Sequence, residues 1–369
     1  MKYPIHNKLA YSALSMMDRF LSLCVAPLLK KNDLSTALQR ILICNTAHLG
    51  DVILTTALLP MLRSAFPKAE IGMLVGSWSK PVLEGHPLVK HIHLIDHWKV
   101  NRRQEDKYFR YLRMRRGTLK QLRVIQYDMA IDCGLHFPNM APLLLQASIP
   151  IRIGFESAGF SPLLTHSCPW DPRDNHSVVE AFASLLKCLP IPFDHSLLRP
   201  TIPISPPQRQ SYTVIHMGSG NTQKNWPEAH WKALVKRLAE EGTHLLFTGI
   251  GAEEYRAIER IKAELPHVEN LCGKLSWNEF TTTIQNAALL IAVDTSAGHI
   301  ASAVGTPAVL LYTGIHPGDV WKPYGGKVIC LTQPMPCSPC FTGCHEMSCL
   351  RSLSVDTVYA AIQSLRVKI

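Results

Sequence analysis

The chain has 369 residues, which is more than a single hydrophobic core usually supports, so two domains are expected. Apolar residues make up 47% of the chain and charged residues 18%, a balance that excludes a disordered protein. No uninterrupted apolar run reaches the roughly 18 residues of a spanning helix, and no signal-peptide pattern is present. We therefore expect a cytoplasmic protein with reduced thiols.

Residues 1–39 form an N-terminal extension that precedes the first regular pattern of strands and helices. The segment 9–29 is apolar, but Asp18 and Arg19 interrupt it. This pattern predicts an amphipathic helix. Two interpretations remain open: the helix packs on the body of the protein, or it lies on a membrane surface.

The segment 40–189 alternates short apolar runs with helical patterns, which is typical of a parallel sheet built from crossover units. A continuous helix is predicted over 52–66, and strands are predicted at 40–45, 71–75, 91–95 and 129–132. A proline-rich linker is predicted at 190–211.

The same alternation resumes after the linker in a second domain, 212–352, followed by a C-terminal segment, 353–369. Strands are predicted at 212–216, 245–248, 289–293 and 308–312, and helices at 227–241, 251–263, 296–304 and 355–365. The expected fold class is α/β, with two doubly wound domains that face each other across a cleft at the carboxyl ends of both sheets.

Basic residues are concentrated between positions 99 and 123. Ten Lys and Arg residues lie there against two acidic residues, so this segment carries most of the formal net charge of +10. An anionic lipid headgroup or a phosphorylated glycolipid fits such a cluster, and no nucleic-acid-binding module accompanies it. The alternative is a solvated helix face. The candidate acceptor-binding residues are Arg102, Arg103, Arg113, Arg115 and Arg116.

A small-residue turn, Met217-Gly218-Ser219-Gly220, follows the predicted strand 212–216 directly, and Lys224 lies four residues further on. Bare backbone N–H groups beside a lysine and a helix N-terminus favour a diphosphate. The turn matches neither a Walker loop nor a dinucleotide-binding glycine pattern, which argues against an NTPase or a dehydrogenase. Many glycine turns after strands bind nothing, and that alternative stays open.

Two polar segments follow buried strands in the two domains. Asp294 and Thr295 emerge after the strand 289–293, and Ser296 is expected to cap the next helix, with Gly298 and His299 on its first turn. In the first domain, Asp51 follows the strand 40–45 and is suited to act as a general base. The alternatives are a capped helix with a satisfied histidine and, for Asp51, ordinary N-capping.

Three segments together resemble glycosyltransferase family nine, the ADP-heptose heptosyltransferases of lipopolysaccharide assembly. They are Leu49-Gly-Asp-Val-Ile-Leu-Thr-Thr56, Lys224-Asn-Trp-Pro-Glu-Ala-His-Trp231 and Val293-Asp-Thr-Ser-Ala-Gly-His-Ile300, and the resemblance runs from about residue 40 to the end.

The resemblance implies a GT-B fold, with the acceptor on the first domain and an ADP-sugar on the second. It implies that Asp51 is the catalytic base and that Lys224 binds the diphosphate, with Gly218 and Ser219 nearby. The other implied donor contacts are Asp294, Thr295, Gly298 and His299 to the sugar and phosphates, Glu253 or Glu254 to the ribose, and Leu275 to the adenine.

The implied reaction inverts the anomeric configuration, because the acceptor attacks opposite the leaving ADP. No Asp-x-Asp pair is suited to Mg²⁺, so metal-independent catalysis is expected. The expected acceptor is a lipopolysaccharide core or a related glycolipid, reached by an enzyme peripheral at the inner membrane. Protein O-heptosylation, another nucleotide sugar, a nucleotide-sugar epimerase and a non-catalytic scaffold are the alternatives.

Four thiols cluster near the C-terminus, at Cys337, Cys340, Cys344 and Cys349. Such short spacing predicts a structural Zn²⁺ or iron site. It resembles the iron-binding cysteine group of the autotransporter heptosyltransferases, with tighter spacing. Four reduced thiols or an adventitious disulfide are the alternatives, and His345 is a candidate substitute ligand.

Overall fold

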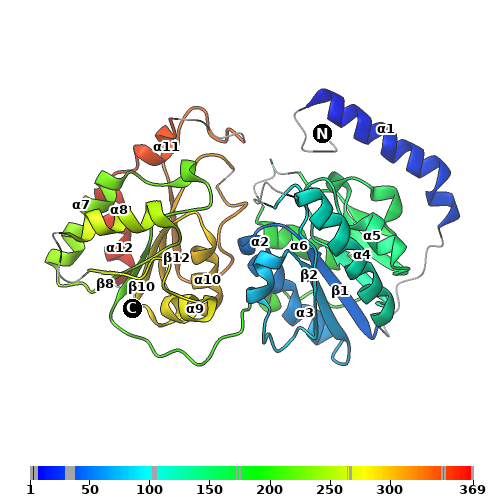
Figure 1. Cartoon of the computed structure of the whole chain (residues 1–369), viewed down its shortest axis with the longest axis horizontal. Helices are drawn as coiled ribbons and strands as arrows, with labels where there is room; N and C mark the ends of the chain where they lie inside the picture. Colours follow the sequence, from blue (N-terminus) through cyan, green and yellow to red (C-terminus); the bar gives the residue numbers. More distant parts are fainter. Residues whose placement is uncertain are drawn as a thin grey trace. The chain divides into compact units, whose positions relative to one another are not determined.

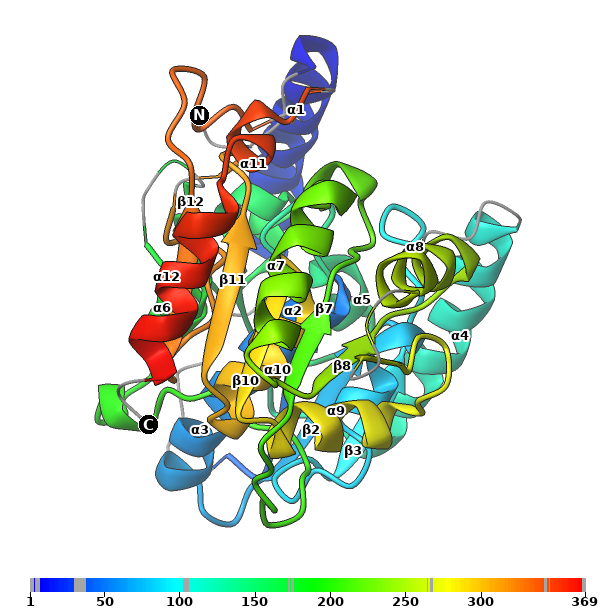
Figure 2. The same cartoon turned by 90° about the vertical axis from the view of Figure 1, so that its left-hand side faces the viewer.

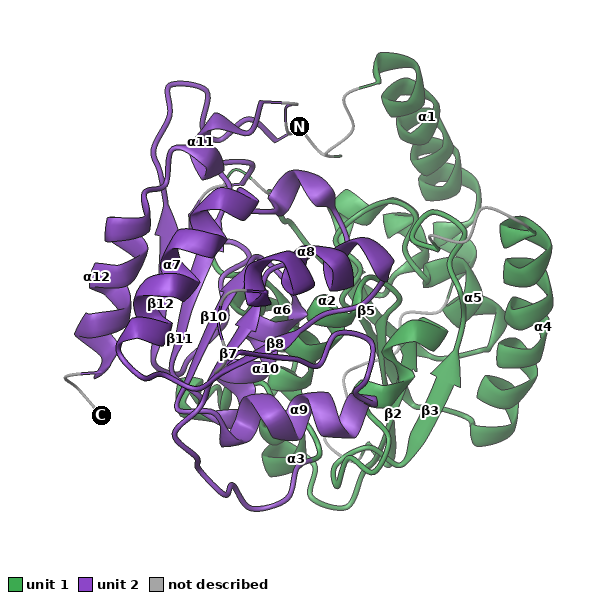
Figure 3. Ribbon diagram, turned by 60° about the vertical axis from the view of Figure 1, so that its left-hand side comes forward, with its two compact units in different colours: residues 1–203 green, residues 204–369 purple. Residues whose placement is uncertain are grey.

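The computed structural model describes residues 3, 7–29, 38–101, 106–171, 173, 176–263, 265, 268–316, 318–341, 344 and 346–366. The chain divides into two compact units, residues 1–203 and 204–369 (Figure 3). The boundary falls inside the proline-rich segment 190–211. Proline has no backbone N–H to donate to a helix or a sheet.

Unit 1 contains a six-stranded parallel sheet in the order β3-β2-β1-β4-β5-β6. Its strands are β1 (Arg40–Asn45), β2 (Glu70–Val75), β3 (His91–Leu94), β4 (Met129–Asp132), β5 (Ile151–Phe155) and β6 (His166–Cys168). This is the Rossmann order, whose topological switch point lies between β1 and β4. The strands β1 and β4 are almost wholly buried, which explains their continuous apolar sequences.

The helices of unit 1 depart from prediction mainly at the segment 52–66, where one continuous helix was expected. The chain forms three shorter pieces there, α2 (Leu49–Thr55), η2 (Thr56–Leu58) and α3 (Leu59–Ala65). Pro60 stands in the first turn of α3 and has no N–H to continue the ladder, so the helix restarts there. The remaining helices are α1 (Lys8–Cys24), η1 (Ala26–Leu28), η3 (Ser77–Val82), α4 (Lys107–Ile125), α5 (Ala141–Gln146), η4 (Glu156–Ala158), η5 (Ser161–Leu163), α6 (Val178–Leu186) and η6 (His195–Leu197).

Unit 2 repeats the same parallel arrangement in the order β12-β11-β10-β7-β8-β9. Its strands are β7 (Thr213–His216), β8 (Leu245–Thr248), β9 (Val268–Asn270), β10 (Leu289–Val293), β11 (Ala308–Tyr312) and β12 (Val328–Thr332). Counted from its own first strand, this is again the Rossmann order, with the switch point between β7 and β10.

Helices cover both faces of the second sheet. They are η7 (Thr222–Lys224), α7 (Glu228–Glu240), α8 (Ala252–Lys262), α9 (Trp277–Asn286), α10 (Ser296–Val304), α11 (Ser348–Arg351) and α12 (Val355–Arg366). The helices α7 and α12 lie side by side on one face (Figures 1 and 2). They share a buried core with the sheet that includes Trp231, Phe247, Ile291 and Ile362. This packing fixes the carboxyl edge of the sheet, where the predicted donor residues lie.

Candidate functional site

The predicted donor residues of unit 2 gather at its topological switch point. The strands β7 and β10 are paired neighbours, with His216 opposite Ala292. The turn 217–220 leaves β7, and Asp294 and Thr295 leave β10, so both segments emerge at the same edge of the sheet. In open α/β sheets, ligands bind at this place.

An ion pair joins two of these predicted residues directly. Lys224 Nζ lies 2.6 Å from Asp294 Oδ2, with the side chains 27% and 13% exposed. Lys224 ends the short helix η7, whose start is capped by the Asn221 side chain accepting from the N–H of Gln223. The pair therefore holds an ammonium group at the carboxyl end of β10, still partly open to a ligand.

The turn after β7 is held in shape by its own residues. The N–H of Ser219 donates to Asn225 Oδ1 at 3.1 Å, and Ser219 Oγ donates to the carbonyl of Asn221 at 2.6 Å. Ser219 thus fixes the loop that carries Lys224. A Cβ at Gly218 would lie 2.3 Å from Glu254 Oε1, so this position must be glycine for the Glu254 carboxyl group to fit.

Glu254 and Glu253 differ sharply, although the sequence left the choice between them open. Glu253 is exposed, whereas Glu254 is half-buried and turns toward the ends of β7 and β8. Burial raises the pKa of Glu254, and backbone N–H groups of Ile250 and Gly218 oppose that rise. Its Oε2 accepts from Ile250 at 3.0 Å, while the buried Oε1 has no hydrogen-bond partner among the described residues. Backbone N–H groups therefore hold the Glu254 carboxyl group at the ends of β7 and β8.

The first turn of α10 differs from the prediction at its cap. Thr295 is the N-cap, and its side chain accepts from the N–H of Ala297 at 3.1 Å, so the prediction that Ser296 caps the helix was wrong. The backbone of Thr295 is still extended, which places the cap one residue earlier. Gly298 is buried against β11, where a Cβ would lie 2.6 Å from Leu310 Cδ1.

His299 is an uncharged histidine beside the ion pair. It is 6% exposed, and burial lowers its pKa to about 4, with Asp294 raising and Lys224 lowering that pKa. Its Nδ1 atom is buried and has no hydrogen-bond partner within the described part of the chain. The imidazole is therefore neutral and packed near the ion pair, with one nitrogen unsatisfied.

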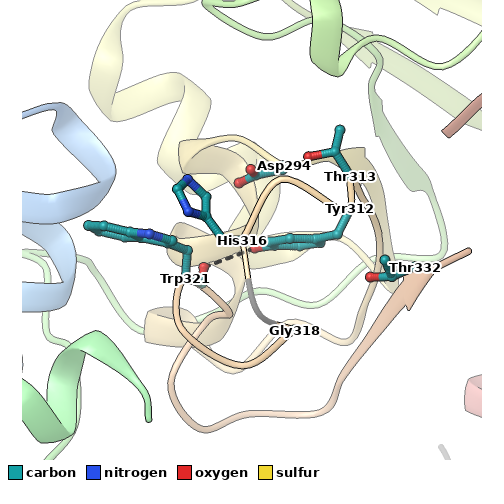
Figure 4. Close-up of a pocket in the computed structure, with 7 residues that line it drawn as sticks. All are labelled: Asp294, Tyr312, Thr313, His316, Gly318, Trp321 and Thr332. Carbon is teal, nitrogen blue, oxygen red and sulfur yellow. Dashed lines mark hydrogen bonds between the residues drawn. The ribbon is translucent and has the colours of Figure 1, made fainter. Parts of the chain in front are cut away.

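Sequence analysis missed His316, which lies in the loop after β11. Together with other residues of unit 2 it lines a pocket: Asp294, Tyr312, Thr313, His316, Gly318, Trp321 and Thr332 (Figure 4). Burial and nearby Lys224 lower the pKa of His316. Tyr312 donates its hydroxyl to the carbonyl of Trp321 at 3.2 Å. The position of His316, just beyond a buried parallel strand, was the signal that could have found it.

Leu275, the expected adenine contact, lies half-buried in the loop between β9 and α9. The helix after it is fixed by a capping box between Ser276 and Glu279. Phe280 on its first turn lies 5.5 Å from the His216 ring, measured between ring centroids. The loop of Leu275 is therefore held firmly beside the end of β7.

Asp51 occupies the corresponding switch point of unit 1, on the first turn of α2 after β1. Its Oδ2 accepts from the N–H of His48 at 3.0 Å, as part of a capping box. Its backbone carbonyl accepts from Thr55 Oγ1 at 2.8 Å. N-capping and a catalytic role are compatible here, because the cap fixes the direction of a half-buried carboxylate.

A second carboxylate at this edge, Asp132, was not predicted. It ends β4 and is 2% exposed, and it accepts from the N–H groups of Met140 at 2.5 Å and Gly134 at 3.0 Å. Burial raises its pKa to about 6, against these hydrogen bonds. Asp132 therefore shapes the 133–140 loop beside Asp51.

The predicted acceptor-binding arginines that the structure describes lie on α4. Arg113 and Arg116 are exposed, while Arg115 is half-buried and donates to Gln146 Oε1 at 2.8 Å. Arg102 and Arg103 lie outside the described residues. Two exposed cations on one helix, Arg113 and Arg116, are thus free to meet an anionic partner.

The four cysteines lie in or beside the loop before α11. Cys349 is buried and its Sγ accepts from the N–H of Gly314 at 3.3 Å, and Cys344 Sγ accepts from that of Met347 at 3.3 Å. Within the residues that the structure describes, no group of three or more His, Cys, Asp or Glu side chains is arranged to hold a metal, and His345 lies outside that set. Cys340 donates its N–H to the carbonyl of Gly314, so this loop supports the turn that carries His316.

Two Rossmann-like units, one with the Lys224–Asp294 ion pair at its switch point, define the class of GT-B transferases that use activated sugars. The family model for "Glycosyltransferase family 9 (heptosyltransferase)" matches residues 115–350, and the chain belongs to this family.

Relatives and solved structures agree with the family. Lipopolysaccharide heptosyltransferase 3 of Escherichia coli is 27% identical over 301 residues, covering 76% of this chain and 85% of that protein. Lipopolysaccharide heptosyltransferase 1 of Pseudomonas aeruginosa is 25% identical, covering 82% and 86%. The structure of E. coli heptosyltransferase WaaC with ADP superimposes with a TM-score of 0.72 at 19% identity, covering 89% of this chain and all of that one, and it shows the same fold.

Proposed function

We propose that this glycosyltransferase moves heptose from ADP-heptose to a lipopolysaccharide core, with inversion at the anomeric carbon. The observation that carries the proposal is the Lys224–Asp294 pair at the switch point of unit 2. The neutral His299 lies beside it, and Glu254 lies at the ends of β7 and β8. Names of the relatives support the donor and the acceptor, since they are lipopolysaccharide heptosyltransferases.

The proposed step forms one bond and breaks another at the anomeric carbon. An acceptor hydroxyl attacks that carbon while Asp51 takes its proton, and the bond to the diphosphate oxygen breaks on the opposite face. Negative charge grows on the departing ADP. Lys224 stabilises this charge, and one such preorganised donor contributes roughly 10²-fold or more to the rate.

Nucleotide recognition in this proposal rests on the edge of the second sheet. Glu254 accepts the ribose hydroxyls, as the acidic residue after the second strand does in other Rossmann folds. Leu275 lies against the adenine. No metal is assigned to the reaction, because Lys224 and the oriented amides take the role that Mg²⁺ fills elsewhere.

The acceptor assignment places the enzyme in the cytoplasm at the inner membrane. Its supports are the relatives' acceptor class and the exposed Arg113 and Arg116 on α4. Phosphates of a glycolipid core match such cations in charge.

The test is a donor screen that measures release of the nucleotide diphosphate. ADP-heptose is compared with UDP- and GDP-sugars, each with lipopolysaccharide that lacks its heptoses and with an unmodified protein acceptor. Turnover with ADP-heptose and the truncated lipopolysaccharide is expected. Turnover with a uridine or guanosine donor alone overturns the donor, and transfer to protein alone overturns the acceptor. Nuclear magnetic resonance of the product gives its anomeric configuration.

We also propose a structural metal, Zn²⁺ or iron, at the four cysteines. The spacing supports it, as do the N–H groups that Cys344 and Cys349 accept from Met347 and Gly314. The described thiols do not by themselves form a three-ligand group. Elemental analysis of the purified chain, compared with a Cys337→Ser/Cys340→Ser variant, decides the question, and metal-free wild-type protein contradicts it.

A further inference from the structure

The helix α1 has two apolar faces, and only one of them is packed. On the inner face Leu14 is 5% exposed, and Leu21 and Val25 pack against a small buried cluster around Leu163 and Leu164. This contact joins α1 to η5 on the surface of unit 1. Figures 1 and 3 show α1 running along the outside of that unit.

The outer face of α1 carries a second stripe of large apolar side chains. Its members, the outer stripe, are exposed by 62–83%: Leu9, Met16, Phe20 and Leu23. Their separations of seven, four and three residues place them on one side of a 3.6-residue helix, opposite Leu14. Leu28, beyond the helix in η1, is 81% exposed. An exposed apolar row of this kind marks an interaction surface.

Asp18 fixes which face of α1 points outward. It is the only acidic residue of the helix and is 3% exposed. It accepts from the Tyr3 hydroxyl at 2.7 Å, from the N–H of Phe160 at 2.9 Å and from Ser161 Oγ at 3.3 Å. Turning the helix to bury the outer stripe would break these bonds. The Asp18 side chain thus faces the protein, and the outer stripe faces away from it.

The charges around the outer stripe are positive. The exposed charged residues of α1 are Lys8 and Arg19, because its one carboxylate is turned inward. Elsewhere on unit 1, α4 exposes Arg113, Arg116, Lys120 and Arg123. An apolar stripe flanked by cations is complementary to a bilayer that contains anionic lipids.

We infer that α1 docks unit 1 onto an anionic lipid bilayer, lying in the plane of the interface with the outer stripe in the acyl boundary. The segment 8–28 is long and apolar enough to cross a membrane by length and composition, and 11% of its apolar window is buried. Crossing would draw the Asp18 carboxylate away from three hydrogen bonds and into hydrocarbon, which is strongly unfavourable. Docking in the interface keeps the Asp18 contacts and buries only the outer stripe.

The experiment is vesicle flotation with the full chain. Vesicles of phosphatidylglycerol and phosphatidylcholine in equal parts are compared with vesicles of phosphatidylcholine alone. The variant Met16→Ser/Phe20→Ser/Leu23→Ser is expected to lower partitioning onto the anionic vesicles by about tenfold or more. The matched control is Val124→Ser, an apolar side chain of α4 that is 81% exposed and outside the stripe, which should bind like the wild type. High salt and neutral vesicles should each weaken wild-type binding.

Several outcomes overturn the inference. If the triple variant binds vesicles like the wild type, the outer stripe does not contact the bilayer. Wild-type protein that resists extraction by alkaline carbonate shows a spanning helix. A third outcome is that the wild type forms a dimer, the triple variant does not, and neither binds vesicles. The outer stripe would then bind a second copy of the chain. Transfer to a deacylated, water-soluble acceptor confirms that the variant is folded, and that readout does not depend on lipid.

Discussion

The two units share one strand order and differ in the chemistry at the edge where their switch points lie. In unit 2 this edge presents an ammonium group at Lys224, a neutral imidazole at His299 and a half-satisfied carboxyl group at Glu254. In unit 1 it presents two carboxylates, Asp51 and Asp132, both of which accept backbone N–H groups. The topology therefore decides where a site lies, and the few residues after each strand decide which charged groups the site presents to a ligand.

This difference suits a division of labour in one reaction. A diphosphate needs a cation, which Lys224 of unit 2 supplies. A nucleophilic hydroxyl needs a proton acceptor, which the carboxylates of unit 1 supply. Each proposed role can be removed separately.

The largest expected effect is at Asp51. Asp51→Asn removes the proposed base but keeps an oxygen that can accept from the N–H of His48, so the helix cap survives. We expect turnover to fall by roughly 10²–10⁴-fold, as for loss of a general base. ADP binding, measured by calorimetry, should stay unchanged because it belongs to unit 2. Wild-type turnover in the variant would remove Asp51 from the chemistry.

The next largest effect is expected at Lys224. Lys224→Met takes the cation from the leaving diphosphate and leaves Asp294 unpaired beside it. We expect kcat to fall by about 10²–10³-fold and ADP to bind more weakly, because a lone carboxylate repels the phosphates.

A double variant separates these two contributions. Lys224→Met/Asp294→Asn should recover part of the ADP affinity without recovering kcat, since the repulsion is gone while the cation is still missing. Equal ADP affinity in the single and double variants would contradict the electrostatic role of the pair.

Several strands that could be predicted from sequence are continuous apolar runs. β1, β10 and β11 are continuous apolar runs, so their strands were found almost to the residue. β5 contains Arg152, whose buried side chain is satisfied by backbone carbonyls such as that of Leu163, and β6 is a short polar run. Arg152 and Gly154 interrupt β5 and β6 is polar, so neither is a continuous apolar run, and both were missed.

Candidate residues for the site could be listed from sequence, but the contacts between them could not. Lys224 and Asp294 were each assigned to the donor, but nothing local reveals an ion pair between residues 70 positions apart. Gly298 was placed on the first turn of the helix from sequence, yet only the fold shows that it packs against Leu310. His316 lies in no recognised motif, so its place beside Asp294 emerged only from the structure.

Smaller effects distinguish neighbouring residues within unit 2. Glu254→Gln should raise the KM for the donor about tenfold, since a charged hydrogen bond to the ribose is replaced by a neutral one. Glu253→Gln is the matched control: Glu253 is exposed, and its KM should equal that of the wild type. Steady-state kinetics at saturating acceptor measures both. The reverse result would assign the ribose to Glu253.

The smallest expected effect is on the free energy of unfolding, when a helix glycine of each unit is replaced by alanine. In α10 of unit 2, Gly298→Ala adds a Cβ that would lie 2.6 Å from Leu310 Cδ1, so the helix or the leucine must shift. In α4 of unit 1, Gly117→Ala adds a Cβ with nothing within 4 Å. We expect Gly298→Ala to lower the free energy of unfolding by about 1–2 kcal/mol, because overpacking exceeds the helix-propensity gain of alanine. Gly117→Ala should raise it by about 0.5–1 kcal/mol.

Urea titration of both variants measures the pair of changes. A shift in α10 also moves Thr295 and His299 on its first turn, so Gly298→Ala should weaken ADP binding as well, whereas Gly117→Ala should not. If Gly298→Ala were stabilising and bound ADP normally, the spacing between α10 and β11 would not constrain the donor edge. Glycine at position 298 would then be a tolerated residue, and the chemistry of unit 2 would rest on its polar side chains alone.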